Sequence, residues 1–291
     1  MVWQPREELL TFEEIARVAR LMVERFGIDS IRLTGGEPTI RAHLDRLVAM
    51  LAELDVDLAL TTNGATLGLV AEPLAKAGLR RINISCDSLR PERFAEITKR
   101  DSLDKVLEGI TAAKSAGFNP VKLNVVAMRG VNDDELVDFA RFGREQGVVV
   151  RFIEFMPLDA QQAWTNDQVV TYDEIVATVG AVYPLEPLTR GSAPAERFRY
   201  VDGGGEIGVV ASVTRSFCST CDRVRLTADG QFRNCLFATE DHDVRALLRN
   251  GGTDDELAAR IARAVAGKWA GHGIGNVNFI RPNRSMSQIG G

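Results

Sequence analysis

Three of the four cysteines of this 291-residue chain lie close together in the sequence, as Cys218, Cys221 and Cys235. Clustered thiolates bind zinc or an iron–sulfur cluster, and a set of three leaves one coordination position free for a substrate or water. Two arginines, Arg223 and Arg225, lie between the second and the third cysteine. An open metal site beside two guanidinium groups predicts a place that holds an anion.

A zinc ribbon is the alternative interpretation of the same cysteines. His242 follows Cys235 by seven residues and would complete a four-ligand zinc site. The spacing alone leaves both interpretations open.

The composition limits the class of protein. With 45% apolar residues the chain can bury one large core or two smaller ones. A formal net charge of −5 argues against a general nucleic-acid binder, which carries a basic surface. No apolar run approaches the roughly 18 residues of a membrane span, and the N-terminal residues lack an apolar signal core. We therefore expect a soluble, cytoplasmic protein without a membrane partner.

Short β-branched segments alternate along the chain with amphipathic helical segments. The predicted strands are 30–34, 56–62, 81–86, 121–126 and 148–154. The first predicted helix starts at Thr11 and ends at Gly27, and the others are 44–54, 70–77, 103–116 and 135–146. This alternation predicts a parallel sheet, curled or open, whose functional residues lie at the carboxyl ends of its strands.

Small polar residues follow several of these strands. The first strand leads into Gly35-Gly36-Glu37-Pro38, where two glycines let the backbone approach a ligand and the glutamate offers a carboxylate acceptor. The other strand ends carry Thr61-Thr62-Asn63-Gly64, Ser85-Cys86-Asp87-Ser88 and Glu154-Phe155-Met156-Pro157. These groups predict a binding site for an amphipathic small molecule.

Taken together, these motifs resemble the GTP 3′,8-cyclase family of radical S-adenosylmethionine enzymes, which acts in molybdenum-cofactor biosynthesis. The resemblance covers essentially the whole chain. Gly-Gly-Glu-Pro alone would indicate only the radical S-adenosylmethionine superfamily. The spacing Cys-x2-Cys-x13-Cys, the Arg-x-Arg within it and the terminal Ile289-Gly290-Gly291 narrow the resemblance to this family. It also rests on the segments 84–88, 122–124 and 151–154.

The resemblance implies two binding sites at positions that match the family. Those for S-adenosylmethionine are Gly35, Gly36, Glu37, Ser85 and Met156. Those for GTP are Arg32, Thr61, Lys122, Arg151, Arg223 and Arg225. The carboxylate of Glu37 would accept from the methionine ammonium group. Because GTP carries about four negative charges, several cations must converge on it.

The resemblance also implies two [4Fe–4S] clusters. Cys218, Cys221 and Cys235 would hold the C-terminal cluster, whose unligated iron contacts guanine in the family. The family's other cluster, which reductively cleaves S-adenosylmethionine, is held by a Cys-x3-Cys-x2-Cys loop that this sequence lacks. Cys86 cannot replace it, because one thiol cannot supply three ligands. We therefore expect that the natural protein extends upstream of Met1, and that strand 30–34 is left with an unpaired edge.

The resulting expectation is an α/β fold with an incomplete parallel TIM-like (β/α) barrel over 1–155, its first strand missing, and a smaller cluster-binding region over 156–291. The implied reaction joins ribose C3′ of GTP to guanine C8, giving 3′,8-cyclo-GTP. No catalytic residue is assigned. The implied partners are GTP, S-adenosylmethionine and an electron donor, and a homodimer stays open. The alternatives are an inactive GTP-binding remnant and a zinc-ribbon binding module.

Overall fold

A curved eight-stranded sheet forms the centre of the computed structural model, which describes residues 5–158, 164–189, 193–269, 271, 273–274, 279–282, 284 and 286–289. Its strands are β1 (Ser30–Leu33), β2 (Asp57–Thr62), β3 (Arg81–Ser85), β4 (Val121–Ala127), β5 (Val149–Glu154), β6 (Leu185–Leu188), β7 (Glu196–Tyr200) and β8 (Glu206–Val210). Their order is β1-β2-β3-β4-β5-β8-β7-β6. Neighbours from β1 to β8 pair in parallel, whereas β7 pairs antiparallel with β8 and with β6.

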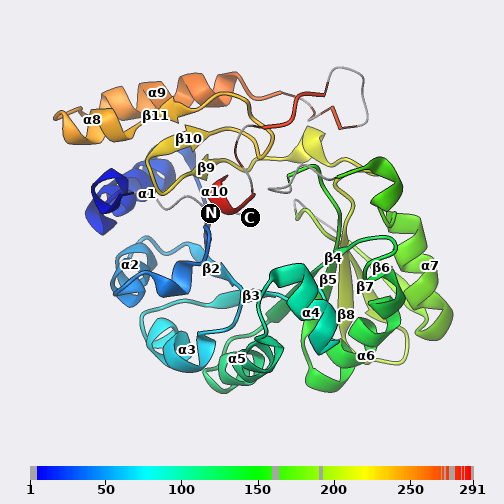
Figure 1. Cartoon of the computed structure of the whole chain (residues 1–291). Helices are drawn as coiled ribbons and strands as arrows, with labels where there is room; N and C mark the ends of the chain where they lie inside the picture. Colours follow the sequence, from blue (N-terminus) through cyan, green and yellow to red (C-terminus); the bar gives the residue numbers. More distant parts are fainter. Residues whose placement is uncertain are drawn as a thin grey trace.

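Helices cover the outer face of this sheet (Figure 1). They are α2 (Leu44–Ala52), α3 (Leu67–Lys76), α4 (Pro91–Thr98), α5 (Leu103–Ser115), α6 (Leu136–Gln146) and α7 (Tyr172–Val182). Strand β4 shows why the two faces differ: buried Leu123 and Val125 alternate with the more accessible Lys122 and Asn124. Since successive side chains of a strand point to opposite faces, the apolar set packs under the helices and the polar set lines the concave inner face.

Helix α1 (Phe12–Phe26) begins and ends as the sequence predicts. The Thr11 hydroxyl accepts from the Glu14 backbone N–H, and the Glu14 carboxylate accepts from the Thr11 N–H, which closes a capping box. The helix stops at Gly27, which takes the left-handed conformation at φ 67°. Val18 and Leu21 of α1 pack in a second apolar cluster with Ile261 of α9 (Asp254–Ala266).

The C-terminal region is a smaller layer across one end of the curved sheet (Figure 1). Strands β9 (Arg225–Leu226), β10 (Gln231–Arg233) and β11 (His242–Asp243) form an antiparallel sheet, followed by α8 (Arg245–Arg249), α9 and the short α10 (Met286–Ile289). Single 3₁₀ turns are η1 (Arg6–Glu8), η2 (Pro38–Ile40), η3 (Asp133–Glu135), η4 (Asn166–Gln168) and η5 (Cys218–Thr220). None of the described helices is long and apolar enough to cross a membrane.

The predicted α/β class and all five predicted strands are confirmed, each with one end that differs by one residue. In the described chain β1 lies at one edge of the sheet. The sheet also contains β6, β7 and β8, which come from the region beyond residue 155 and were not predicted. Strand β8 extends the parallel set beyond β5. The division of the chain at 155 stays a prediction.

Helix α5 approaches the turn after β2 so closely that it requires a glycine. A Cβ atom on Gly109 would lie 2.3 Å from the carbonyl oxygen of Gly64 and 3.2 Å from Cβ of Leu67. The turn that follows Thr61 and Thr62 therefore depends on a residue of α5 without a side chain.

The substitution Gly109→Ala should lower the free energy of unfolding by about 1–3 kcal/mol, because backbone must move to admit the methyl group. Chemical denaturation measures the change. Gly68→Ala on α3 is the matched control: a Cβ there meets nothing within 4 Å, and alanine favours the helix by a few tenths of a kcal/mol or more. Equal stability of the two variants would contradict this account of the packing.

Candidate functional site on the concave face of the sheet

A band of polar side chains runs across the inner face of four strands. In the register of the sheet Thr61 lies beside Asn83, and Asn83 lies beside Lys122. One step along the strands, Asn124 lies beside Arg151. Because these positions alternate with buried apolar ones, all of them project to the concave side. The parallel sheet thus gathers side chains that lie up to ninety residues apart in the sequence.

Arg151 is the best-anchored cation of this band. Its side chain is 8% exposed, its Nε donates to Asn124 Oδ1 at 2.9 Å, and its Nη2 donates to Asn83 Oδ1 at 3.0 Å. Burial lowers the pKa of Arg151 to about 10, and the positive charges of Arg32 and Arg81 lower it further. The guanidinium group is therefore fixed in place, while burial and neighbouring cations destabilise its charged form. A bound anion would stabilise that charge.

Lys122 lies beside Arg151 on the same face. Burial and the neighbouring charge of Arg151 lower the pKa of Lys122 to about 8, and Glu206 offsets only part of the shift. Within the described ranges no carboxylate comes within 4 Å of its ammonium group. An anion that binds near this lysine stabilises its charged form and raises its pKa.

Arg223, in the segment before β9, lies near enough to Arg151 to contribute to the lowering of its pKa. Burial lowers the pKa of Arg225 to about 10, with further contributions from Arg223 and Arg32. Arg32 stays accessible to solvent. Partial burial lowers its pKa, and the positive charges of Arg223 and Arg81 lower it further. The predicted GTP-binding cations therefore converge.

Glu37 makes hydrogen bonds that the sequence did not predict. Its Oε1 accepts from the backbone N–H of Thr39 at 3.0 Å, from the Thr39 hydroxyl and from the Thr62 hydroxyl at 2.7 Å, while Oε2 accepts from the Asn63 N–H at 2.7 Å. The carboxylate thus ties the ends of β1 and β2 together. Only Oε2 retains capacity for another donor, so a contact with an ammonium group stays a prediction.

The other residues predicted for S-adenosylmethionine lie at the same edge of the sheet. Gly35 adopts φ 149°, and a Cβ atom there would meet nothing within 4 Å, so its backbone is open to a ligand. Gly36 is exposed, and Ser85 ends β3 beside Asn124. Met156 packs in a third apolar cluster with Cys235 and Ile289, which brings this position next to the cysteine segment.

The three clustered cysteines are partly accessible and each has a polar neighbour. Cys218 Sγ lies 3.0 Å from the Ser216 hydroxyl, and Cys235 Sγ accepts from the Phe237 N–H at 3.4 Å. Cys221 Sγ accepts from Arg223 Nε at 3.4 Å. Burial raises the pKa of the Cys221 thiol, but the hydrogen bond and charge of Arg223 outweigh this and hold the pKa below its ordinary value. These surroundings suit thiolate ligands.

Side chains that ligate metals do not meet in the described part of the chain, where no three His, Cys, Asp or Glu residues are placed to hold a metal ion. Neither the three clustered cysteines nor the zinc-ribbon set that adds His242 is gathered as a ligand set among these residues, and His242 lies on β11 opposite Phe232 of β10. Cys86 is 1% exposed, and burial raises its pKa to about 12. It is a buried thiol.

The segment that leads to the cysteines is anchored by Glu154, at the end of β5. Its buried carboxylate accepts from the backbone N–H groups of Tyr172, Val213 and Thr214 at 2.7–2.9 Å and from the Thr214 hydroxyl. Hydrogen bonds from three backbone donors satisfy this charge without a cation. Glu154 thereby links the sheet to the segment at Thr214, and Cys218 lies four residues after Thr214.

The C-terminal tail is tied to the C-terminal layer by an ion-pair latch. Arg284 bonds Asp229 at 3.0 and 3.2 Å and Asp241 at 2.9 Å, and Asp241 also pairs with buried Arg233 of β10. Two residues after Arg284, the Met286 N–H donates to the Leu158 carbonyl. Ile289 is 2% exposed, and Gly290 and Gly291, named in the family resemblance, lie outside the described residues.

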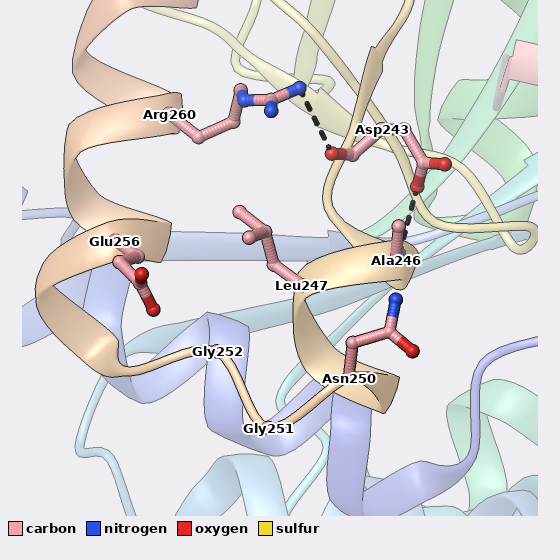
Figure 2. Close-up of a pocket in the computed structure, with 8 residues that line it drawn as sticks. All are labelled: Asp243, Ala246, Leu247, Asn250, Gly251, Gly252, Glu256 and Arg260. Carbon is pink, nitrogen blue, oxygen red and sulfur yellow. Dashed lines mark hydrogen bonds between the residues drawn. The ribbon is translucent and has the colours of Figure 1, made fainter.

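A surface pocket of about 470 Å³ lies elsewhere, between α8 and α9 (Figure 2). Asp243, Glu256 and Arg260 line it, and Arg260 donates to the Asp243 carbonyl at 3.4 Å. None of the predicted site residues lines this pocket. It is separate from the concave face.

Asn83, Asn124 and Asp87 are residues of the site to which the sequence analysis gave no role. Burial raises the pKa of Asp87 to about 6, and its carboxylate accepts from the Val126 N–H. The alternation of polar residues at 81, 83, 85 and 87 through an otherwise apolar strand was the available signal. It marks a strand with one polar face.

Comparison with known proteins agrees with this geometry. The Radical SAM superfamily model matches residues 2–143, and the Molybdenum Cofactor Synthesis C model matches residues 148–274. The GTP 3′,8-cyclase 2 of Mycobacterium tuberculosis is 48% identical over 298 residues, with 99% of this chain and 82% of that protein covered. The GTP 3′,8-cyclase of Streptomyces coelicolor is 48% identical over 295 residues, with 99% and 86% covered.

The match to a solved structure of methylornithine synthase covers 63% of this chain and 55% of the synthase chain, at 17% identity and a TM-score of 0.48. The fold, the concave polar face and the family models define a radical S-adenosylmethionine enzyme. More specifically, the chain belongs to the GTP 3′,8-cyclase family.

Replacing Arg284 by Gln should release the tail, because the change removes three N–H donors from Asp229 and Asp241. We expect the free energy of unfolding to fall by about 1–3 kcal/mol and limited proteolysis of the tail to become faster. Arg199→Gln is the control, since its partner Glu186 and Arg199 are both more than half exposed and such pairs contribute under about 1 kcal/mol. Equal proteolysis of both variants would argue against the latch.

Proposed function

We propose that this chain forms the GTP-binding face of an enzyme that, with S-adenosylmethionine, catalyses the 3′,8-cyclisation for which its relatives are named. The product would be 3′,8-cyclo-GTP, a precursor in molybdenum-cofactor biosynthesis. The observation that carries the proposal is the convergence of Lys122, Arg151 and Arg225, whose pKa values are all lowered by burial and by one another or by neighbouring arginines. A polyanion relieves this repulsion, and the triphosphate of GTP is one.

In this proposal each part of the site has one task. Lys122 and Arg151 orient the triphosphate, with Arg32 and Thr61 on the same face of the sheet. Arg223 and Arg225 approach from the C-terminal layer and turn the guanine end toward the cysteine segment. Orientation of this kind lowers the entropic part of the barrier to a ring closure, because the reacting carbons are held near each other.

The site for S-adenosylmethionine is proposed at the edge formed by Gly35, Gly36, Ser85 and Met156. Open backbone at Gly35 supports it, and Oε2 of Glu37 has room for one donor from the methionine ammonium group.

Cys218, Cys221 and Cys235 are the proposed ligands of a [4Fe–4S] cluster. Their partial exposure and the donors around Cys221 support this, because cluster sulfurs and thiolates are stabilised by such hydrogen bonds. The cluster would supply an open iron as a Lewis acid toward guanine.

The residues present do not fit the cluster that cleaves S-adenosylmethionine in this family. Of the four cysteines three belong to the C-terminal set, and the fourth, Cys86, is buried. An external electron donor, assembly as a homodimer, cytoplasmic location and a functional boundary near residue 155 remain proposals that rest on the family resemblance.

The pH dependence of GTP binding tests the proposed function. Lys122, with a pKa of about 8 in the free protein, is charged below that pH and must take up a proton to face a phosphate above it. The affinity should therefore be full below pH 8 and fall by up to about tenfold per pH unit above it. Isothermal titration between pH 7 and 9 measures this.

Lys122→Met is the control for that titration, because it should bind GTP more weakly at pH 7 and lose the decline between pH 8 and 9. A wild-type chain that does not bind GTP would refute the proposed function. The same decline of GTP affinity with pH in both proteins would show that Lys122 does not contact the bound GTP.

Iron content tests the proposed cluster ligands. After anaerobic reconstitution with iron and sulfide, Cys235→Ser should lose the roughly four iron atoms of the wild-type chain, since two thiolates hold a cluster poorly. His242→Ala should keep them. Loss of metal from the histidine variant, with zinc bound to the wild type in equal amount, would instead support a ribbon.

A further inference from the structure

The arginine at the centre of the concave face has partners unlike those of many arginines in this protein. Arg129, Arg144 and Arg199, for example, each pair with a carboxylate at 2.6–2.8 Å. Arg151 is instead held by two amide oxygens, those of Asn124 at 2.9 Å and Asn83 at 3.0 Å. In the described chain no carboxylate lies within 4 Å of its guanidinium group.

The orientation of the Asn83 amide is set by its other contacts. Its Nδ2 donates to the Leu60 carbonyl at 3.2 Å and to the Thr61 hydroxyl at 3.3 Å. The carbonyl oxygen must therefore face Arg151. Asn83 is only 4% exposed, so the amide cannot turn without leaving buried polar groups unsatisfied.

An amide and a carboxylate would orient this guanidinium group equally well, but with different electrostatic results. A carboxylate would cancel most of the positive charge at close range, whereas an amide oxygen accepts the hydrogen bond and carries no net charge. Arg81, on the same face of the sheet, has a carboxylate partner instead: it pairs with Asp57 at the start of β2. Amide partners therefore keep Arg151 both fixed and available to an external anion.

We infer that Asn83 and Asn124 are positioning residues which aim Arg151 at the triphosphate while leaving its charge unneutralised. This inference deepens the proposed function and rests on it for the identity of the nucleotide. For the anion-binding part it rests only on the contacts of Arg151. The ligand chemistry it requires is a polyphosphate.

Asn124→Asp is the sharpest variant, because Asn124 Oδ1 contacts Arg151 and its Nδ2 has no hydrogen-bond partner in the described residues. The carboxylate keeps the contact and adds one negative charge. Asn124→Ala removes the contact and adds none. Asn250→Asp, at the exposed end of α8 (Figure 2), adds the same charge away from the concave face.

Isothermal titration with inorganic triphosphate and with GTP, on the full chain and at one salt concentration, measures the effect. We expect Asn124→Asp to weaken both ligands by about tenfold or more, Asn124→Ala to weaken them less, and Asn250→Asp to match the wild type. A purely structural role predicts the reverse order, with Ala worse than Asp. Thermal unfolding of each variant confirms that it folds.

The variant Asn83→Asp tests the second amide contact of Arg151 in the same way. Its added oxygen would face the Leu60 carbonyl, so its stability should fall more than that of Asn124→Asp, while its triphosphate affinity falls in the same direction. Wild-type affinity in Asn124→Asp, or weaker binding in Asn124→Ala than in Asn124→Asp, overturns the inference.

The two proposals fail separately. If triphosphate shows the expected order of variants but GTP binds no more tightly than triphosphate, nucleotide recognition is wrong and the positioning role stands. If GTP binds well and the aspartate variants bind it like the wild type, the positioning role is wrong and the proposed function stands. If the wild type binds neither ligand, both are wrong.

Discussion

Repulsion between buried cations on the concave face is the interaction on which the rest of this structure depends. Burial and mutual charge lower the pKa of Lys122 to about 8 and those of Arg151 and Arg225 to about 10. An arrangement of this kind destabilises the protein unless an anion is bound, so it must be held by stronger forces. The apolar outer face of the sheet, with Leu60, Ile82 and other fully buried side chains packed under helices, supplies them.

The carboxylates of the site serve the backbone rather than these cations. Glu37 ties the end of β1 to the end of β2, and Glu154 ties β5 to the chain that leads to the cysteines. Each satisfies its charge with several hydrogen bonds from N–H and O–H donors. Negative charge is thereby used to fix strand ends, and positive charge is left for a ligand. The latch at Arg284 then joins the tail to the C-terminal layer.

The sequence predicted those parts of the site that local patterns encode. Five strands and the capping box at Thr11 follow from periodicity and from side chains three residues apart. Strands β6 to β8 were missed because short segments with Pro187 and a Gly-rich turn carry little periodic signal. The use of Glu37 could not be predicted, since its partner Asn63 lies 26 residues away. The amide contacts of Arg151 depend on strand register in the same way.

A structure of the full chain with GTP bound would test the central claim most directly. We predict that oxygen atoms of the triphosphate lie within hydrogen-bond distance of Lys122 and Arg151, with Asn83 and Asn124 still bonded to the guanidinium group. The guanine should then lie toward Arg225 and the cysteine segment. A triphosphate bound away from the concave face, for example in the pocket between α8 and α9, would contradict the account.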